Sequence, residues 1–174
     1  MKWDNYFLMI AQVAASKSKD PSTKVGAVIT RPDRSIVAVG YNGFPRGIAD
    51  TSERLNDRNI KYSLVVHAEM NAILSARESL EGYTLYTVPF MPCDRCFVHV
   101  IQSGIKRVVY LRASEDQTQR WGEAFKRVEA LAVEAGIEMV EYESADPINE
   151  TAYEDELWLK RMHRANDARA EMST

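Results

Sequence analysis

The sequence predicts an α/β domain of three layers, α/β/α, in which helices cover both faces of one mixed five-stranded sheet. Two observations predict this fold class. Short β-branched segments alternate with helical segments through the second half of the chain, as in parallel strands joined by right-handed helical crossovers. The first half instead carries two β-branched runs separated by a turn signal, which predicts an antiparallel hairpin. The expected order of elements is α β β α β α β α β.

Length, composition and charge restrict the class of protein. The chain has 174 residues, 45% of them hydrophobic and 27% charged, which suits one folded globular domain. A formal net charge of −3 does not favour nucleic acid or an anionic membrane as a partner. No apolar run reaches the ~20 residues of a membrane span, and the first residues lack a secretory signal, so we expect a cytoplasmic protein. We expect the main domain over residues 1–150 and a charged helical extension over 151–174.

The first elements are a helix and a hairpin. Apolar residues recur at helical spacing between Trp3 and Ser16, which predicts an amphipathic helix. Val25–Ile29 and Ile36–Gly40 are β-branched runs on either side of a Pro-Asp turn, and they predict two antiparallel strands. The segment from Tyr41 to Lys61 combines glycine, proline and many charges, so we expect a long functional loop that borders the site.

The later elements alternate between helix and strand. Alanines and apolar residues at helical spacing predict the helices, and β-branched or aromatic runs predict the strands. Glycines follow two of the helices, where a left-handed cap would end them. The expected elements are a helix over His67–Arg77, a strand over Tyr83–Val88, a helix from Pro92 to Ser103, a strand over Arg107–Leu111, a helix over Gln119–Glu134 and a strand over Ile137–Tyr142.

Two short motifs at the starts of successive helices carry the chemistry. They are His67-Ala-Glu69 and Pro92-Cys-Asp-Arg-Cys96, and the 26 residues from the histidine to the first cysteine allow both helix N-termini to meet at one edge of the sheet. A histidine and two thiolates are three ligands suited to Zn²⁺, and they leave a fourth position for water, which is typical of a catalytic zinc site. Because the cysteines form a close C-x-x-C pair, metal or redox chemistry is favoured over a disulfide scaffold.

Glu69 has a place in this chemistry as a base. A bound zinc ion would lower the pKa of water from ~15.7 to ~7, and the Glu69 carboxylate could then move protons between water, a ring nitrogen and departing ammonia. An H-x-E motif paired with P-C-x-x-C is the signature of zinc nucleobase deaminases. The alternatives are a closed structural zinc site with His99 as fourth ligand, and a thiol redox pair. The closed structural site leaves Glu69 without a role.

Longer segments around these motifs resemble a known family. Ser18–Ile29, Gly40–Gly47, Val66–Ile73 and Pro92–Cys96 with the following Ile-Gln-Ser-Gly-Ile-Lys are similar to deoxycytidylate deaminases, and the resemblance runs from about residue 5 to residue 142. It implies a cytidine-deaminase-like fold and conversion of dCMP to dUMP and ammonia, which supplies thymidylate synthesis. It also implies one catalytic zinc ion held by the His and the two Cys residues of the motifs, with Glu69 as proton shuttle.

The resemblance extends to substrate contacts. Asn42 matches the asparagine that positions the nucleotide sugar, and Ala68 lies inside the His-Ala-Glu motif and is included among the substrate contacts. Lys24 and Arg77 are the two cations that we select for contact with the phosphate, and a subunit interface is the alternative place for Arg77, which lies one helix length from His67. The sequence does not choose firmly among the cations near the site, which are Lys24, Arg46, Arg54, Arg58, Lys61 and Arg77.

Assembly and regulation are further expectations from the family. Relatives tend to form hexamers regulated by dCTP with Mg²⁺ and by dTTP, and Gly43 and Gly47 match glycine-rich residues near the effector. The extra structural zinc of some relatives is not expected, since no cysteine precedes Cys93 and no histidine precedes His67. The alternative functions are deamination of another amino-substituted ring, such as a 5-substituted dCMP, another cytosine nucleotide, a free base or tRNA adenosine, and a non-enzymatic zinc-stabilised binding module.

Overall fold

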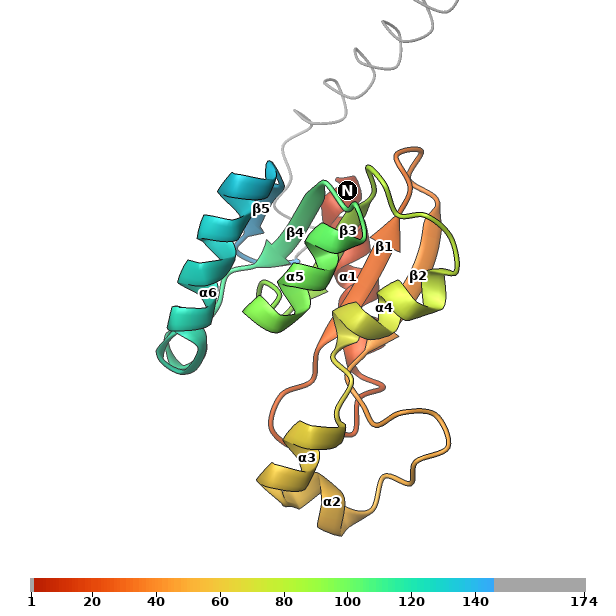
Figure 1. The fold of residues 1–174 in the computed structure, drawn as a ribbon, viewed down its shortest axis with the longest axis vertical. Helices are drawn as coiled ribbons and strands as arrows, with labels where there is room; N and C mark the ends of the chain where they lie inside the picture. The colour runs from red at the N-terminus through yellow and green to blue at the C-terminus, as the bar shows by residue number, and fades with distance from the viewer. Residues whose placement is uncertain (1, 146–174) are drawn as a thin grey trace, which may run out of the picture.

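The computed structural model describes residues 2–145 and contains five strands and six helices in that range (Figure 1). The expected helix over residues 151–174 and the boundary at residue 150 lie outside the described residues. In chain order the elements are α1 Trp3–Ala15, β1 Gly26–Thr30, β2 Ile36–Tyr41, α2 Ser52–Asn56, α3 Arg58–Leu64, α4 Ala68–Ala76, β3 Thr84–Val88, α5 Asp94–Gln102, β4 Arg107–Leu111, α6 Glu115–Ala135 and β5 Glu138–Tyr142.

The strands form one mixed sheet in the order β2-β1-β3-β4-β5. β1 is antiparallel to both β2 and β3, and Val28 at its centre pairs with Val39 on one side and Tyr86 on the other. β3, β4 and β5 run parallel, with α5 and α6 as the crossovers between them. The prediction of a mixed five-stranded sheet with an N-terminal hairpin is therefore confirmed.

Helices cover both faces of this sheet. α1 packs against one face, where Phe7 and Leu8 meet Val28 and Tyr86 in a buried cluster. α4, α5 and α6 cover the opposite face, as Figure 1 shows. The core on that side is formed by side chains from the sheet and the three helices, among them Ile29, Leu85, Val108, Phe97, Val100, Phe125 and Val128. The three-layer α/β/α prediction is confirmed. Within residues 2–145, no helix combines the length and apolarity needed to cross a bilayer.

The segment expected to be a long loop contains two short helices. α2 begins after Thr51, whose side chain accepts a hydrogen bond from the Arg54 N–H. α3 begins after Asp57, whose carboxylate accepts from the N–H groups of Asn59 and Ile60. Both starts are side-chain caps, a local signal that weighs more here than apolar periodicity. In Figure 1 the two helices project from the end of the sheet.

Two other details explain how the sequence forms the domain. α6 begins at Glu115, four residues before the expected start, because Ser114 and Gln117 form a capping box there. Gly40 on β2 lets α4 come close to the sheet: a Cβ atom at this position would overlap the Ala68 carbonyl oxygen and lie 2.6 Å from the Ala72 nitrogen. This close approach fixes the first turn of α4, which follows His67.

Candidate active site

His67, Cys93 and Cys96 converge at the N-terminal ends of two neighbouring helices. His67 is the residue before α4 and Cys93 the residue before α5, and both have extended backbone at the cap position. The His67 Nδ1 atom lies 3.5 Å from the Cys93 Sγ and 3.3 Å from the Cys96 Sγ. The three ligand atoms lie within 4.8 Å of one another, and no other group of this kind occurs among the described residues.

The environment of the cluster favours a thiolate at Cys93, whereas the hydrogen bond to Cys93 and burial raise the pKa of Cys96. The Cys93 and Cys96 thiols lose their protons as a coupled pair. The pKa of Cys93 lies below the usual thiol range because its sulfur accepts hydrogen bonds from Cys96 and His67. The same hydrogen bond to Cys93 raises the pKa of His67. The positive ends of α4 and α5 add to this preference for negative charge.

Glu69 lies beside the cluster and has one unpaired carboxylate oxygen. Its side chain is 4% exposed, and Oε2 has no hydrogen-bond partner in the described part of the chain. Burial, and then the charge of Cys93, raise the pKa of Glu69. One imidazole and two thiol ligands, together with a buried carboxylate that has one unpaired oxygen, fit a zinc ion with a water molecule in the remaining position. We conclude that the residues present suit the catalytic form of a zinc site.

The closed-site alternative is not supported by the position of His99. This histidine lies on the exposed side of α5, and its Nδ1 atom is 2.8 Å from the Arg95 carbonyl oxygen of the preceding turn. It is not part of the cluster of ligand atoms. Within residues 2–145 the cluster therefore has three protein ligands.

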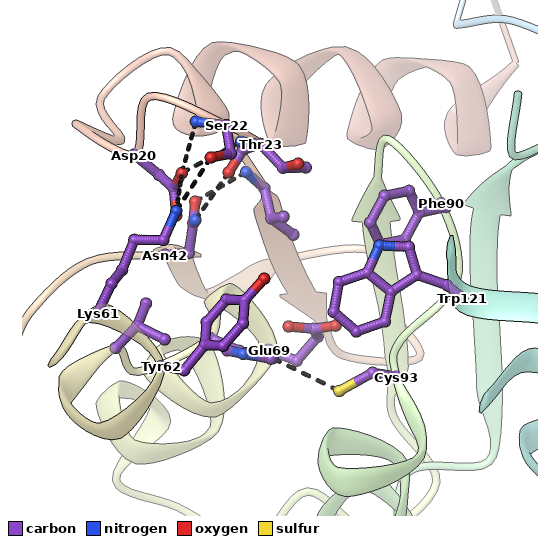
Figure 2. A pocket seen from close by; sticks show the side chains of 13 residues that line it. Asp20, Ser22, Thr23, Asn42, Lys61, Tyr62, Glu69, Phe90, Cys93 and Trp121 are labelled. Carbon is purple, nitrogen blue, oxygen red and sulfur yellow. Dashed lines mark hydrogen bonds and ion pairs between the residues drawn. The ribbon is translucent and has the colours of Figure 1, made fainter. Parts of the chain in front are cut away.

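A cavity of about 80 Å³ opens over His67, Glu69 and Cys93. Figure 2 shows Tyr62 and Trp121 on opposite sides of the Glu69 carboxylate, with Phe90 next to Trp121. The Phe90 and Trp121 rings are 6.4 Å apart between centroids. Aromatic walls of this kind suit a flat ring. None of the three aromatic side chains is predicted from the sequence, since they come from three separate elements or loops.

Asn42 lines this cavity and also organises its wall. Its side chain is 5% exposed, Oδ1 accepts the Val25 N–H at 2.8 Å, and Nδ2 donates to the Thr23 carbonyl at 2.9 Å. These bonds hold the segment that enters β1. An amide retains one more lone pair and one more N–H, so Asn42 can still contact a sugar hydroxyl.

Lys61 joins α3 to the same wall. Its Nζ atom lies 3.1 Å from Asp20 Oδ1 and 3.1 Å from Ser22 Oγ, and the side chains of the Lys61–Asp20 ion pair are 7% and 12% exposed. The dashed lines of Figure 2 show these contacts. Asp20 in turn accepts the Ser22 N–H at 2.7 Å. The projecting α2–α3 segment is thereby anchored to the loop before β1.

The remaining predicted contacts lie in different places. Ala68 is fully buried in the core and does not line the catalytic cavity. Lys24 is exposed and lines neither this cavity nor the cavity of about 620 Å³ that shares Tyr62 and Trp121 with it. Arg77 is the left-handed cap at the end of α4 away from His67. Gly43 lines a cavity of about 120 Å³ that shares Asp20, Asn42, Lys61 and Val65 with the catalytic cavity. Gly47 has a positive φ in the loop before α2.

Comparison with known proteins agrees with this geometry. A family model described as the cytidine and deoxycytidylate deaminase zinc-binding region matches residues 1–112. The chain is 44% identical over 138 residues to an uncharacterized deaminase in the luxG 3′ region of Aliivibrio fischeri, with 79% of this chain and 92% of that protein covered. It is 40% identical over 119 residues to the deoxycytidylate deaminase of Mus musculus, with 64% and 65% covered. Its fold is similar to the crystal structure of dCMP deaminase from the cyanophage S-TIM5 in apo form, with a TM-score of 0.63, 25% identity and coverage of 82% and 100%.

Proposed function

The chain belongs to the cytidine and deoxycytidylate deaminase family, and from this premise we propose that it catalyses zinc-dependent hydrolytic deamination of dCMP to dUMP and ammonia. The observation that carries the proposal is the convergence of His67, Cys93 and Cys96 beside the buried Glu69 carboxylate, whose Oε2 has no hydrogen-bond partner in the described part of the chain. Similarity to the deoxycytidylate deaminase of mouse and to the dCMP deaminase of the cyanophage supports dCMP as the substrate.

In this mechanism each side chain of the site has one task. His67, Cys93 and Cys96 would hold the zinc ion, which when bound would supply Lewis acidity and lower the pKa of water from ~15.7 to ~7. Glu69 takes a proton from water as the oxygen bonds to C4 of cytosine, and delivers it to N3. Glu69 then transfers the second proton to the 4-amino group, and the C4–N bond breaks to release ammonia. The sum is one water consumed and one ammonia formed.

The walls of the cavity orient the ring for this reaction. Tyr62 and Trp121 lie on either side of the Glu69 carboxylate, so a cytosine ring between them presents its edge to Glu69. Asn42 offers its second N–H and lone pair to the sugar. Fixing the ring and the sugar together brings the reacting atoms to hydrogen-bond distance before the reaction, and this positioning contributes to the rate.

A substrate panel tests the proposal. Purified zinc-loaded protein is offered dCMP, CMP, dCTP, deoxycytidine, cytosine and 5-methyl-dCMP, and ammonia release is measured together with loss of cytosine absorbance. We expect preferred turnover of dCMP, and loss of turnover with retained zinc in Glu69→Gln. Preferred turnover of another compound would keep the mechanism and replace the substrate. Full activity of Glu69→Gln would exclude the proposed role of this carboxylate.

Assembly and regulation form part of the same proposal. We expect a cytoplasmic homo-hexamer regulated by a nucleoside triphosphate with Mg²⁺, with the effector near Gly43 and Gly47. Support comes from the cavity beside Gly43, whose lining includes Lys17 and a Lys19 that is paired with Asp50 at 2.8 Å. Gel filtration at several protein concentrations, with and without dCTP and Mg²⁺, tests both expectations. A monomer under every condition would contradict the hexamer.

A further inference from the structure

We propose that Asn71 is a positioning residue of the active site, whose side-chain amide holds the His67 end and the Asn42 end of the catalytic cavity at a fixed separation. Asn71 does not line that cavity, so it acts through these two neighbours and not on the substrate itself. This inference rests on the proposed function, because it concerns the residues that would hold the zinc ion and the nucleotide sugar.

The Asn71 amide bridges two backbone segments that are far apart in the sequence. Its Nδ2 atom donates to the Tyr41 carbonyl oxygen at 2.7 Å and to the Val66 carbonyl oxygen at 3.4 Å. An amide nitrogen carries two N–H donors, so one side chain can serve both carbonyls. Tyr41 directly precedes Asn42, and Val66 directly precedes His67. The amide is therefore bonded to the neighbour of the metal ligand and to the neighbour of the sugar contact.

A short β-bridge joins the same two segments. The Gly43 N–H donates to the Val66 carbonyl at 3.1 Å, and the Val66 N–H donates to the Gly43 carbonyl at 2.9 Å. Asn71 lies one helical turn beyond His67, and its backbone N–H donates to the His67 carbonyl at 2.9 Å. Its side chain thus ties this bridge to the first turn of α4, which packs closely on β2 at Gly40. The bridge, the metal ligand and the start of the helix form one hydrogen-bonded unit.

His67 does not secure the start of α4 with its own side chain. It is the N-cap residue, but its imidazole makes no capping hydrogen bond, and Nδ1 lies 3.5 and 3.3 Å from the two cysteine sulfurs. A capping side chain normally accepts an N–H of the first turn and fixes the entry into the helix. Asn71 holds this entry instead, through the backbone that leads into His67. Hydrogen-bonded groups that orient a metal ligand typically change metal affinity by about 10–100-fold.

The test compares wild type with Asn71→Ala and Asn71→Asp, which lack the N–H donors, and with Asn71→Gln, which keeps them on a longer side chain. Zinc affinity is measured by competition with a chelator, and the visible absorption of the Co²⁺-substituted proteins reports the geometry of the metal site. For the alanine and aspartate variants we expect about tenfold weaker zinc binding, an altered Co²⁺ spectrum at full occupancy, and about tenfold lower kcat for dCMP with the metal saturated. Asn71→Gln should lie between these variants and wild type.

Ser103→Ala is the matched control. Ser103 is also half-buried and donates from its side chain to a backbone carbonyl, that of Val100 at 2.9 Å, but it lies at the end of α5 away from the cysteines. Its zinc affinity, Co²⁺ spectrum and kcat should match those of wild type. Urea denaturation of all five proteins measures separately how much each side chain contributes to stability.

Two results would overturn the assignment. One is a lower urea midpoint for the Asn71 variants with zinc affinity, Co²⁺ spectrum and metal-saturated kcat as in wild type, which is what a purely structural hydrogen bond gives. The other is an equal effect of Ser103→Ala. The deamination assay separates this inference from the proposed function. If wild type deaminates dCMP and the Asn71 variants match it, the positioning role is wrong and the reaction stands. If wild type deaminates nothing on the panel but the variants lose zinc affinity and change the Co²⁺ spectrum, the positioning role stands and the reaction is wrong.

Discussion

Replacing Asn42 with alanine should lower the free energy of unfolding by about 2–4 kcal/mol. The side chain is 5% exposed and makes two hydrogen bonds to backbone, one with the Val25 N–H at 2.8 Å and one with the Thr23 carbonyl at 2.9 Å. Alanine leaves both groups without this partner, and a buried unpaired polar group costs about 1–3 kcal/mol. Two such groups would together cost about 2–6 kcal/mol. We take the lower part of this range because Thr23 and Val25 are only half-buried and water can reach their backbone groups.

Urea denaturation of wild type and variant measures this loss directly, and thermal unfolding should show a Tm lower by roughly 5–15 °C. Asn59→Ala is the matched control, because Asn59 is exposed and its side chain makes no hydrogen bond in the described part of the chain. Its stability should stay within about 0.5 kcal/mol of wild type. Asn42→Asp should be no more stable than the alanine variant, since a carboxylate oxygen would face the Thr23 carbonyl. If Asn42→Ala unfolds at the same urea concentration as wild type, the structural role assigned to this amide is wrong.

Two further predictions concern the packing of helices on the sheet. Asp4→Ala should cost about 3–5 kcal/mol, because Asp4 is 7% exposed and holds Arg107 through two hydrogen bonds of 2.8 and 2.7 Å. Burial alone would raise the pKa of Asp4, but the hydrogen bonds and charge of Arg107 hold that pKa below its ordinary value. The stabilisation from the Asp4 carboxylate is therefore present above about pH 4, and it is lost as the pH falls through the folded-state pKa. In urea denaturation the gap between wild type and variant should close in acid, and a gap independent of pH contradicts this. Gly40→Ala should push α4 away from β2 and lower the free energy of unfolding by about 1–3 kcal/mol. Because His67 precedes α4, the amount of bound zinc, measured by atomic absorption, should also fall. Unchanged stability and zinc content would contradict the close packing of α4 on Gly40.

The predicted fold class agrees with the structure because hydrophobic periodicity determines which faces are buried. Periodicity alone places the start of α6 too late, because Ser114 and Gln117 form the capping box in a stretch that precedes the apolar stripe. It does not reveal the helices α2 and α3 for a related reason. They are five and seven residues long and have only one buried residue between them, Lys61, so they carry little apolar periodicity. The side-chain caps at Thr51 and Asp57 are the available signal.

The ligand cluster is predictable because His67, Cys93 and Cys96 lie in short motifs with defined spacing at helix starts. The cavity walls are not predictable in the same way. Lys61 and Asp20 are 41 residues apart, and their ion pair depends on how α3 folds back onto the loop before β1. Trp121 lies in a helix whose sequence pattern shows only that it is amphipathic. Pairings of this kind are set by tertiary structure and leave no local spacing to read.

The central claim is that one zinc ion held by His67, Cys93 and Cys96 is required for deamination with Glu69 as the proton carrier. The most direct measurement is to strip the metal, add Zn²⁺ back in steps, and follow bound zinc and dCMP turnover together. We predict that activity rises in proportion to zinc and reaches its maximum at one ion per chain, while Glu69→Gln binds the same amount and stays inactive. Turnover by metal-free protein, or maximal activity without zinc bound at this cluster, would contradict the account.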